Sequence, residues 1–242
     1  VERDVTIDFG GLEVTCSANP AIRIQGNVNV TVKNGKMNTE GYNFILGASD
    51  GSSAGNLTIE SGTFHGTTTV ASVTKGNLNI TGGEFSVEPY QGSYAFLINC
   101  IDANYNNGAT VSISGGTFHN WNPENNAAEG AGTNFCATGY MAEKIECEHG
   151  DCYKVIEGVY VAQVGEVKYK TVAAAVAAAT AGDVIELLVN VTEDVTVNNS
   201  VTIDGANFQY TGNISVSGNT TAITVKNVNF VNGTGYAITT NR

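Results

Sequence analysis

The sequence predicts an all-β protein, a right-handed parallel β-helix solenoid interrupted by a capping hairpin and by one short α-helix that starts a second β-helical unit. A nine-residue pattern recurs as NLTIESGTF from Asn56, NLNITGGEF from Asn77 and TVSISGGTF from Thr110. With looser copies included, the pattern starts at residues 4, 29, 56, 77 and 110, which are 21 to 33 residues apart, and again at residues 200 and 222. A repeat of this length is typical of solenoid coils that stack on one another. Charged residues make up only 14% of the chain whereas glycine occurs 29 times, a composition that suits short strands joined by turns.

One copy of the repeat shows how a coil is built. Alternation within NLTI sends Leu57 and Ile59 to the inside and leaves the residues between them outside. Gly62 makes the corner, where a positive φ is tolerated, and Phe64 turns back inside. Each buried aliphatic side chain contributes about 1.5 to 3 kcal/mol. Stacking predicts three interior ladders, namely Val5, Val30, Leu57, Leu78 and Val111; Ile7, Val32, Ile59, Ile80 and Ile113; and Leu12, Met37, Phe64, Phe85 and Phe118.

Residues 1–121 are predicted to form the first parallel β-helix, because the repetition stops at Trp121. Residues 122–158 are predicted to form a turn-rich loop and a capping hairpin, since the short strands in YMAEKIE and CYKVIEG flank a tight loop from Glu148. The hairpin would cover the end of the solenoid, where open backbone groups invite edge-to-edge aggregation. Second strands of the coils are expected at 21–24, 42–46, 70–73 and 94–100.

Residues 159–242 are predicted to form a helix-capped second β-helical unit. The helix is expected over 169–181, with Val172 and Val176 on one stripe at i, i+4 spacing and Gly182 at its end. A strand over 184–189 and the copies at 200 and 222 follow. Only about three coils are built, so this unit is expected to be incomplete or to continue elsewhere. The chain begins inside a repeat, so we expect a mature product or a fragment.

The acidic composition excludes two classes of partner. The formal net charge is -12, with 11 Lys and Arg against 23 Asp and Glu. Nucleic-acid binding needs clustered basic residues that displace counterions, and anionic membrane surfaces need the same charge. The longest apolar stretch, VAAAVAAATAG from Val172, is too short to span a bilayer. We therefore expect no nucleic acid, no membrane insertion and no cofactor.

Three segments carry a resemblance to a known group of proteins. NLTIESGTF, TVSISGGTFHNWNPENNAAEGAGTNF and AQVGEVKYKTVAAAVAAATAGDVIELLVNVTEDVTV resemble repeat segments of large surface proteins of gut bacteria and of their phages. Those proteins are identified as pectate-lyase-like right-handed parallel β-helices, and the similarity covers nearly the whole chain. The group usually has an aliphatic residue after TNF and a plain hairpin beyond, where this chain has Cys136 and ECEHGDC. That departure raises the question of a disulfide or a bound metal.

The resemblance implies an extracellular location, on a cell surface or a virion. It implies a non-catalytic module for adhesion, assembly or glycan binding, whose partner is a glycan or another surface component. A homotrimer or a longer fibre stays open, because solenoids of this kind also serve as fibre segments. The same fold carries polysaccharide-cleaving enzymes, so the fold alone does not decide function.

The alternative is a polysaccharide lyase or glycosidase, a depolymerase, with Glu84, Glu88 and Asp102 at its site. Glycoside hydrolysis needs two carboxyl groups about 5 to 9.5 Å apart, and neighbouring coils, about 4.8 Å apart, could supply them. The Arg base with a calcium-binding Asp cluster of pectate lyases and the NTD, DD and GHG motifs of polygalacturonases are missing from the sequence. His65 and His119 each follow the phenylalanine that ends a copy of the repeat, Phe64 or Phe118, and they lie two coils apart, about 10 Å. Solvated surface residues are the favoured interpretation of both sets.

Five cysteines occur, at positions 16, 100, 136, 147 and 152. An odd count suggests secretion only weakly. Cys147 and Cys152 flank the hairpin loop, so a disulfide between them is favoured over free thiols. A metal held by these two residues with His149 and Cys136 is the third alternative.

Four aromatic residues lie in the long insertions rather than on the core ladders. Sugar rings stack on exposed aromatic rings through their apolar faces, and loops carry function more often than scaffolds do. Packing of the loops onto the solenoid is an equal alternative. The candidates for glycan contact are Tyr90, Tyr94, Tyr105 and Trp121.

Overall fold

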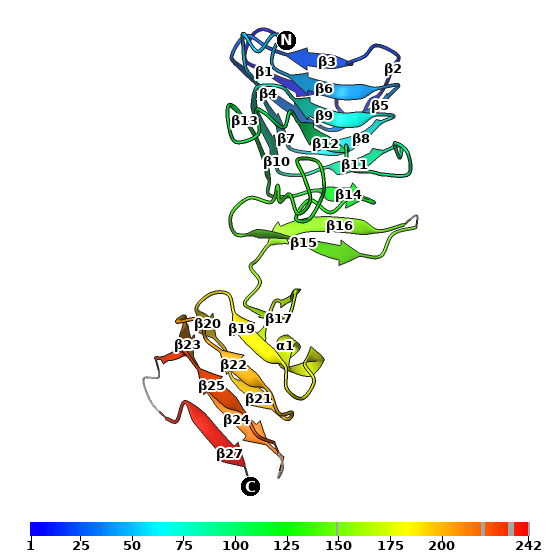
Figure 1. Ribbon diagram of the computed structural model, residues 1–242. Coiled ribbons are helices and arrows are strands. Elements are labelled where there is room, and N and C mark those ends of the chain that lie inside the picture. The colour runs from blue at the N-terminus through cyan, green and yellow to red at the C-terminus, as the bar shows by residue number, and fades with distance from the viewer. Residues whose placement is uncertain (149, 219–220, 232–234, 242) are drawn as a thin grey trace. The chain divides into compact units, whose positions relative to one another are not determined.

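The computed structural model describes residues 1–148, 150–218, 221–231 and 235–241. The chain divides into two compact units, residues 1–157 and 158–242. Both are built almost entirely of short strands that stack into parallel sheets, so each is a β-solenoid (Figure 1).

Three parallel sheets form the first unit, and strands from successive coils lie next to one another in each sheet. One sheet contains β1 (Val5–Asp8), β4 (Val28–Lys33), β7 (Gly55–Ile59), β10 (Gly76–Ile80) and β13 (Ala109–Ile113). The second contains β2 (Glu13–Cys16), β5 (Gly35–Thr39), β8 (Gly62–Gly66), β11 (Glu84–Val87) and β14 (Thr117–His119). The third contains β3 (Ile22–Ile24), β6 (Tyr42–Leu46), β9 (Thr69–Val73) and β12 (Ile98–Cys100).

The first two predicted ladders are confirmed by the strand register. Val5 lies opposite Val30, and the series continues through Leu57 and Leu78 to Val111. The ladder from Ile7 to Ile113 follows the same pairing, two residues further along each strand. The alternation of apolar and polar residues therefore sets the register, because a slip of one residue would turn every inward side chain out.

The third ladder is confirmed except for its first member. Phe85 stacks between Phe64 and Phe118, with ring centroids 5.5 and 4.9 Å apart. The prediction of Leu12 is wrong, because Val14 is the residue opposite Met37 and Leu12 is 71% exposed. Val14 follows Ile7 by seven residues, whereas Met37 follows Val32 by five, so the first coil has two extra residues at this corner and its inward position is shifted.

One strand is shorter than predicted. The expected strand over 94–100 is reduced to β12, because Tyr94 and Leu97 close a turn in which the Leu97 N–H donates to the Tyr94 carbonyl at 3.1 Å. The corner at Gly62 is as predicted, with a φ of +128°. A Cβ there would lie 2.5 Å from the Gly35 carbonyl oxygen, so the coils approach too closely for any side chain.

A hairpin closes one end of the first unit. β15 (Tyr140–Ile145) pairs antiparallel with β16 (Cys152–Glu157), and β16 pairs antiparallel with β14, as Figure 1 shows. The preceding loop adds apolar cover, since Trp121 lies 5.5 Å from the Phe118 ring and 6.0 Å from the Phe135 ring. The hairpin thus covers the edge of the second sheet, and the loop covers the end of the aromatic ladder.

The second unit repeats this architecture on a smaller scale. Antiparallel β17 (Ala162–Val164) and β18 (Val167–Tyr169) begin a sheet in which β17 also pairs antiparallel with β19 (Val184–Leu187). From β19 the sheet continues in parallel through β22 (Thr202–Asp204) and β25 (Thr224–Lys226). A second sheet holds β20 (Val191–Thr192), β23 (Gln209–Thr211) and β26 (Asn229–Phe230). The third holds β21 (Val195–Val197), β24 (Ile214–Ser217) and β27 (Ile238–Asn241).

The helix α1 (Val172–Ala178) is shorter than the predicted 169–181. Tyr169 belongs to β18, and Ala179 already has an extended backbone. Thr171 is the N-cap, as its hydroxyl accepts the Ala174 N–H at 3.0 Å. No helix in the described part of the chain is long and apolar enough to cross a membrane.

Candidate functional site

Neighbouring coils place Glu84 beside His119. Glu84 begins β11 and His119 ends β14, and these strands pair in parallel with Phe85 opposite Phe118. Inward phenylalanines therefore leave both polar side chains on the outer face, where His119 Nε2 lies 2.7 Å from Glu84 Oε1. The imidazole side chain is 25% exposed and the carboxylate 52%, so the histidine is the better shielded partner.

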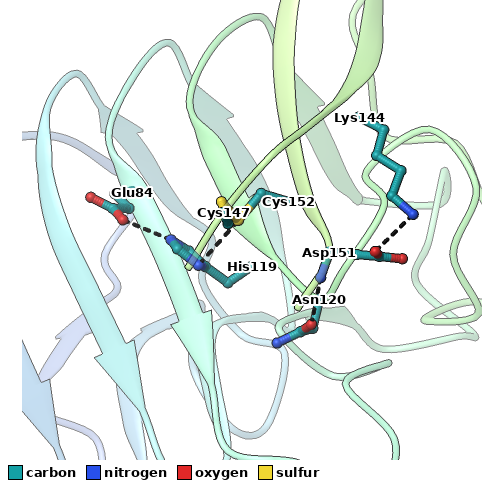
Figure 2. The surroundings of a disulfide bond; sticks show 7 residues. All are labelled: Glu84, His119, Asn120, Lys144, Cys147, Asp151 and Cys152. Atoms are coloured by element: carbon teal, nitrogen blue, oxygen red, sulfur yellow. Dashed lines mark hydrogen bonds and ion pairs between the residues drawn. A yellow bond between two sulfur atoms is a disulfide. The ribbon is translucent and has the colours of Figure 1, made fainter. Parts of the chain in front are cut away.

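The other ring nitrogen of His119 faces the capping hairpin. His119 stands directly opposite Cys152 in the antiparallel pair of β14 and β16, and its Nδ1 lies 3.3 Å from the Cys152 Sγ. Cys152 is fully buried and is joined by a disulfide to the half-buried Cys147. Figure 2 shows the resulting chain of contacts from the Glu84 carboxylate through the imidazole to the sulfur.

The interpretation of both histidines as solvated corner residues does not hold for His119, which bridges two coils and the hairpin. His65 has a separate set of contacts, with its Nδ1 2.9 Å from the Ser86 hydroxyl and its Nε2 3.4 Å from Glu88 Oε1. The two histidines follow equivalent phenylalanines in their coils, but only His119 meets sulfur. This difference arises from the register of the hairpin, which no local sequence pattern encodes.

The structure groups a different set of potential metal ligands from the set predicted from the sequence. Within the described residues, the ligand atoms that lie within 4.8 Å of one another belong to His119, Cys147 and Cys152. Cys136 is absent from this group, since it pairs with Ile113 at the end of the first sheet, and burial raises the pKa of its thiol to about 12. The fourth predicted ligand, His149, lies outside the described residues.

The three carboxylates of the enzyme alternative have different partners. Glu84 contacts His119 and Glu88 contacts His65, whereas Asp102 follows β12 on the third sheet. Sequence reasoning missed the carboxyl group beside Asp102, which is Glu129. Glu129 lies in the turn-rich loop, where nothing in the local pattern marks it as a partner for the end of β12.

Glu129 has the strongest perturbation among the described carboxyl groups. Burial raises its pKa to about 7 and the charge of Asp102 adds to this rise, although the Cys100 N–H opposes it by donating to Glu129 Oε1 at 2.6 Å. Burial and then the Glu129 charge also raise the pKa of the Cys100 thiol to about 12, which leaves that thiol protonated and unreactive.

The four aromatic candidates for glycan contact separate into two groups. Trp121 is only 3% exposed and its Nε1 donates to the Ala95 carbonyl at 3.2 Å, so no ring face is available to a sugar. Tyr94 and Tyr105 are partly buried against the core. Trp121 and Tyr105 both pack against the ring of Phe135, in the loop that covers the end of the solenoid, and this contact explains their burial. Tyr90, in contrast, is 58% exposed.

These observations define a class of protein. The chain is a parallel β-solenoid protein with stacked aromatic and aliphatic ladders inside and small polar clusters on its coils. Comparisons with protein-family models, with characterised proteins and with solved structures gave no significant match.

Proposed function

We propose that the chain is a non-catalytic extracellular β-solenoid module of a bacterial surface protein or a phage fibre. Such a module acts in adhesion, assembly or glycan binding, and the glycan-binding role is the one that the residues support best. The observation that carries it is the exposed ring of Tyr90 in the longest insertion between neighbouring coils of the repeat.

The Tyr90 ring is held in place before any ligand arrives. The backbone of Tyr90 exchanges two hydrogen bonds with Ser93, at 2.8 and 2.9 Å. Phe96, which is 38% exposed, supports the ring from one side in an edge contact with centroids 6.3 Å apart. The apolar face of a sugar can stack on such a ring, and a preformed platform lowers the entropy cost of binding.

The test is retention on a panel of capsular and mucin polysaccharides, with new reducing or unsaturated ends measured in the same samples. Tyr90→Ala is expected to weaken binding of a retained glycan about fivefold, which corresponds to about 1 kcal/mol of stacking. Tyr236→Ala is the control, because Tyr236 is also an exposed tyrosine, at 80%, but belongs to the second unit, outside the loop to which the proposal assigns binding. Equal retention of the two variants would remove Tyr90 from the proposal.

A depolymerase remains the second candidate function, and one observation favours it. Glu129, with its pKa of about 7, is suited to donate a proton, and the neighbouring Asp102 is a second carboxyl group. If new chain ends accumulate on any polysaccharide, Glu129→Gln and Asp102→Asn should each abolish their formation. Cleavage that these substitutions stop would replace the non-catalytic proposal.

A further inference from the structure

We propose that Cys147 and Cys152, once their disulfide is reduced, form with His119 a binding site for a divalent transition metal ion, with Zn²⁺ as the best match. This site is independent of the glycan-binding role. Oxidation closes it, because the sulfur atoms then bond to each other. Reduction of the disulfide therefore creates the metal site, and oxidation removes it.

The positions of the ligand atoms suit tetrahedral coordination. Zn–S bonds of about 2.3 Å and Zn–N bonds of about 2.0 to 2.1 Å place neighbouring ligand atoms roughly 3.5 to 3.8 Å apart. His119 Nδ1 already lies 3.3 Å from Cys152 Sγ, and all three ligand atoms lie within 4.8 Å of one another. The Cα atoms of Cys147 and Cys152 are 5.9 Å apart, so the sulfur atoms can separate by side-chain rotation. Three protein ligands leave the fourth position to water or to an external ligand.

Glu84 prepares the histidine for this role. With Nε2–H donating to Glu84 Oε1 at 2.7 Å, the lone pair of Nδ1 is directed at the sulfur of Cys152. A carboxylate behind a ligating imidazole fixes its tautomer and orientation in many zinc sites. His65 also has a carboxylate, that of Glu88, but its second nitrogen meets the hydroxyl of Ser86 instead of a sulfur atom.

The hairpin loop has supports other than the disulfide. Lys144 Nζ lies 2.7 Å from Asp151 Oδ1, across the base of the loop. Asn120 ties Asp151 to the neighbouring strand, since the Asn120 N–H donates to the Asp151 carbonyl at 2.6 Å and the Asp151 N–H donates to Asn120 Oδ1 at 3.1 Å (Figure 2). These contacts keep Cys147 and Cys152 near His119 after reduction.

The chemistry balances as two steps. A phosphine reductant breaks the S–S bond and takes oxygen from water, so that two thiols and one phosphine oxide form. The metal ion then displaces a proton from each thiol, and the two thiolates and neutral imidazole give a site with no net charge. In the reverse direction a low-molecular-weight disulfide, such as oxidised glutathione, accepts the two electrons by thiol–disulfide exchange and leaves as two thiols with two protons from water, so that the Cys147–Cys152 bond forms again, two ligands are lost and the ion is released.

Cobalt(II) titration of the phosphine-reduced full chain tests the proposal. We expect one Co²⁺ per chain, with a thiolate-to-cobalt charge-transfer band and the visible bands of a tetrahedral ion, and competition by Zn²⁺. The oxidised chain should give neither band. The double variant Cys147→Ser/Cys152→Ser is the first control, because it keeps the other three cysteines. A reduced wild-type spectrum equal to that of the double variant would overturn the proposal.

Three single variants test the individual roles. His119→Ala should abolish saturable binding, whereas His65→Ala, in the equivalent position of its coil, should leave it unchanged. Glu84→Gln should weaken binding about 10- to 100-fold, as expected for a group that orients a ligand. Undiminished binding by His119→Ala would remove the histidine from the site and refute the ligand set.

X-ray absorption of the zinc-loaded wild type keeps the test independent of variant folding. Two sulfur atoms at about 2.3 Å and nitrogen or oxygen atoms at about 2.0 to 2.1 Å are expected. A coordination shell without sulfur, or with four sulfur atoms, would contradict the proposed ligands.

Discussion

Replacing Phe85 by alanine is the sharpest test of the solenoid core. The Phe85 side chain is fully buried and contacts two other rings, with centroids 5.5 Å away at Phe64 and 4.9 Å away at Phe118. Truncation of a buried phenylalanine costs about 3 to 5 kcal/mol, and each lost ring contact accounts for about 0.5 to 1.5 kcal/mol of this. Both neighbouring coils lose a partner, so we expect Phe85→Ala to lower the free energy of unfolding of the first unit by about 4 kcal/mol.

The assay is denaturant unfolding followed by tryptophan fluorescence. The chain has a single tryptophan, Trp121, which packs against Phe118 and therefore reports on the first unit alone. This matters because a signal from both units would mix two transitions. Phe85→Leu, which keeps most of the volume but loses both ring contacts, should lower the free energy of unfolding by about 1 to 3 kcal/mol, less than Phe85→Ala. A loss for Phe85→Ala no larger than that for the half-exposed Phe96→Ala would refute the idea that the stack forms the core.

Three further predictions concern the same unit. Gly62→Ala should lower the free energy of unfolding by more than about 1 kcal/mol, because φ is +128° and the new Cβ would lie 2.5 Å from a backbone oxygen of the preceding coil. Gly51→Ala, with φ +70° and no atom within 4 Å of the new Cβ, should lower it less in the same fluorescence assay. The raised pKa of Glu129 means that its carboxyl holds a proton more tightly in the folded state, so its contribution to stability is complete below the usual carboxyl pKa and disappears as the pH rises through about 7. Unfolding midpoints between roughly pH 5 and pH 8 should therefore change less in Glu129→Gln than in the wild type, and an unchanged pH dependence would contradict the raised pKa. Reduction of the Cys147–Cys152 disulfide in the absence of metal should lower stability by about 2 kcal/mol, as expected for a short closed loop, and an unchanged midpoint would show that the other contacts of the loop suffice.

Most of the first unit could be predicted from its sequence, because the spacing of residues within each repeat determines which residues of neighbouring coils pair. Residues such as Leu57 and Ile59 recur at fixed offsets from a glycine corner, and parallel stacking then places equivalent residues opposite one another. Leu12 shows the limit of this reasoning. Its turn is longer than those of the later coils, and a pattern read from its neighbours assigns the inward position to the wrong residue.

The polar clusters could be predicted only in part, because they depend on contacts between segments outside the repeat. The proximity of Cys147 and Cys152 follows from a short hairpin loop, which a local pattern does indicate. The contact of His119 with Cys152 depends on how the hairpin docks on β14, and the approach of Glu129 to Cys100 depends on how a loop folds back. Trp121 lies in a polar stretch that suggests exposure, yet the open end of the aromatic ladder needs apolar cover.

The antiparallel hairpin also has a consequence for the order of events during synthesis. The ribosome delivers β14 before β16, and Phe118 emerges before Trp121 and Phe135, the rings that cover it. Earlier coils can stack on one another as soon as they emerge. The end of the last coil, in contrast, stays uncovered until the hairpin has left the exit tunnel as far as residue 157. In this interval the nascent chain offers an unsealed aromatic face to chaperones.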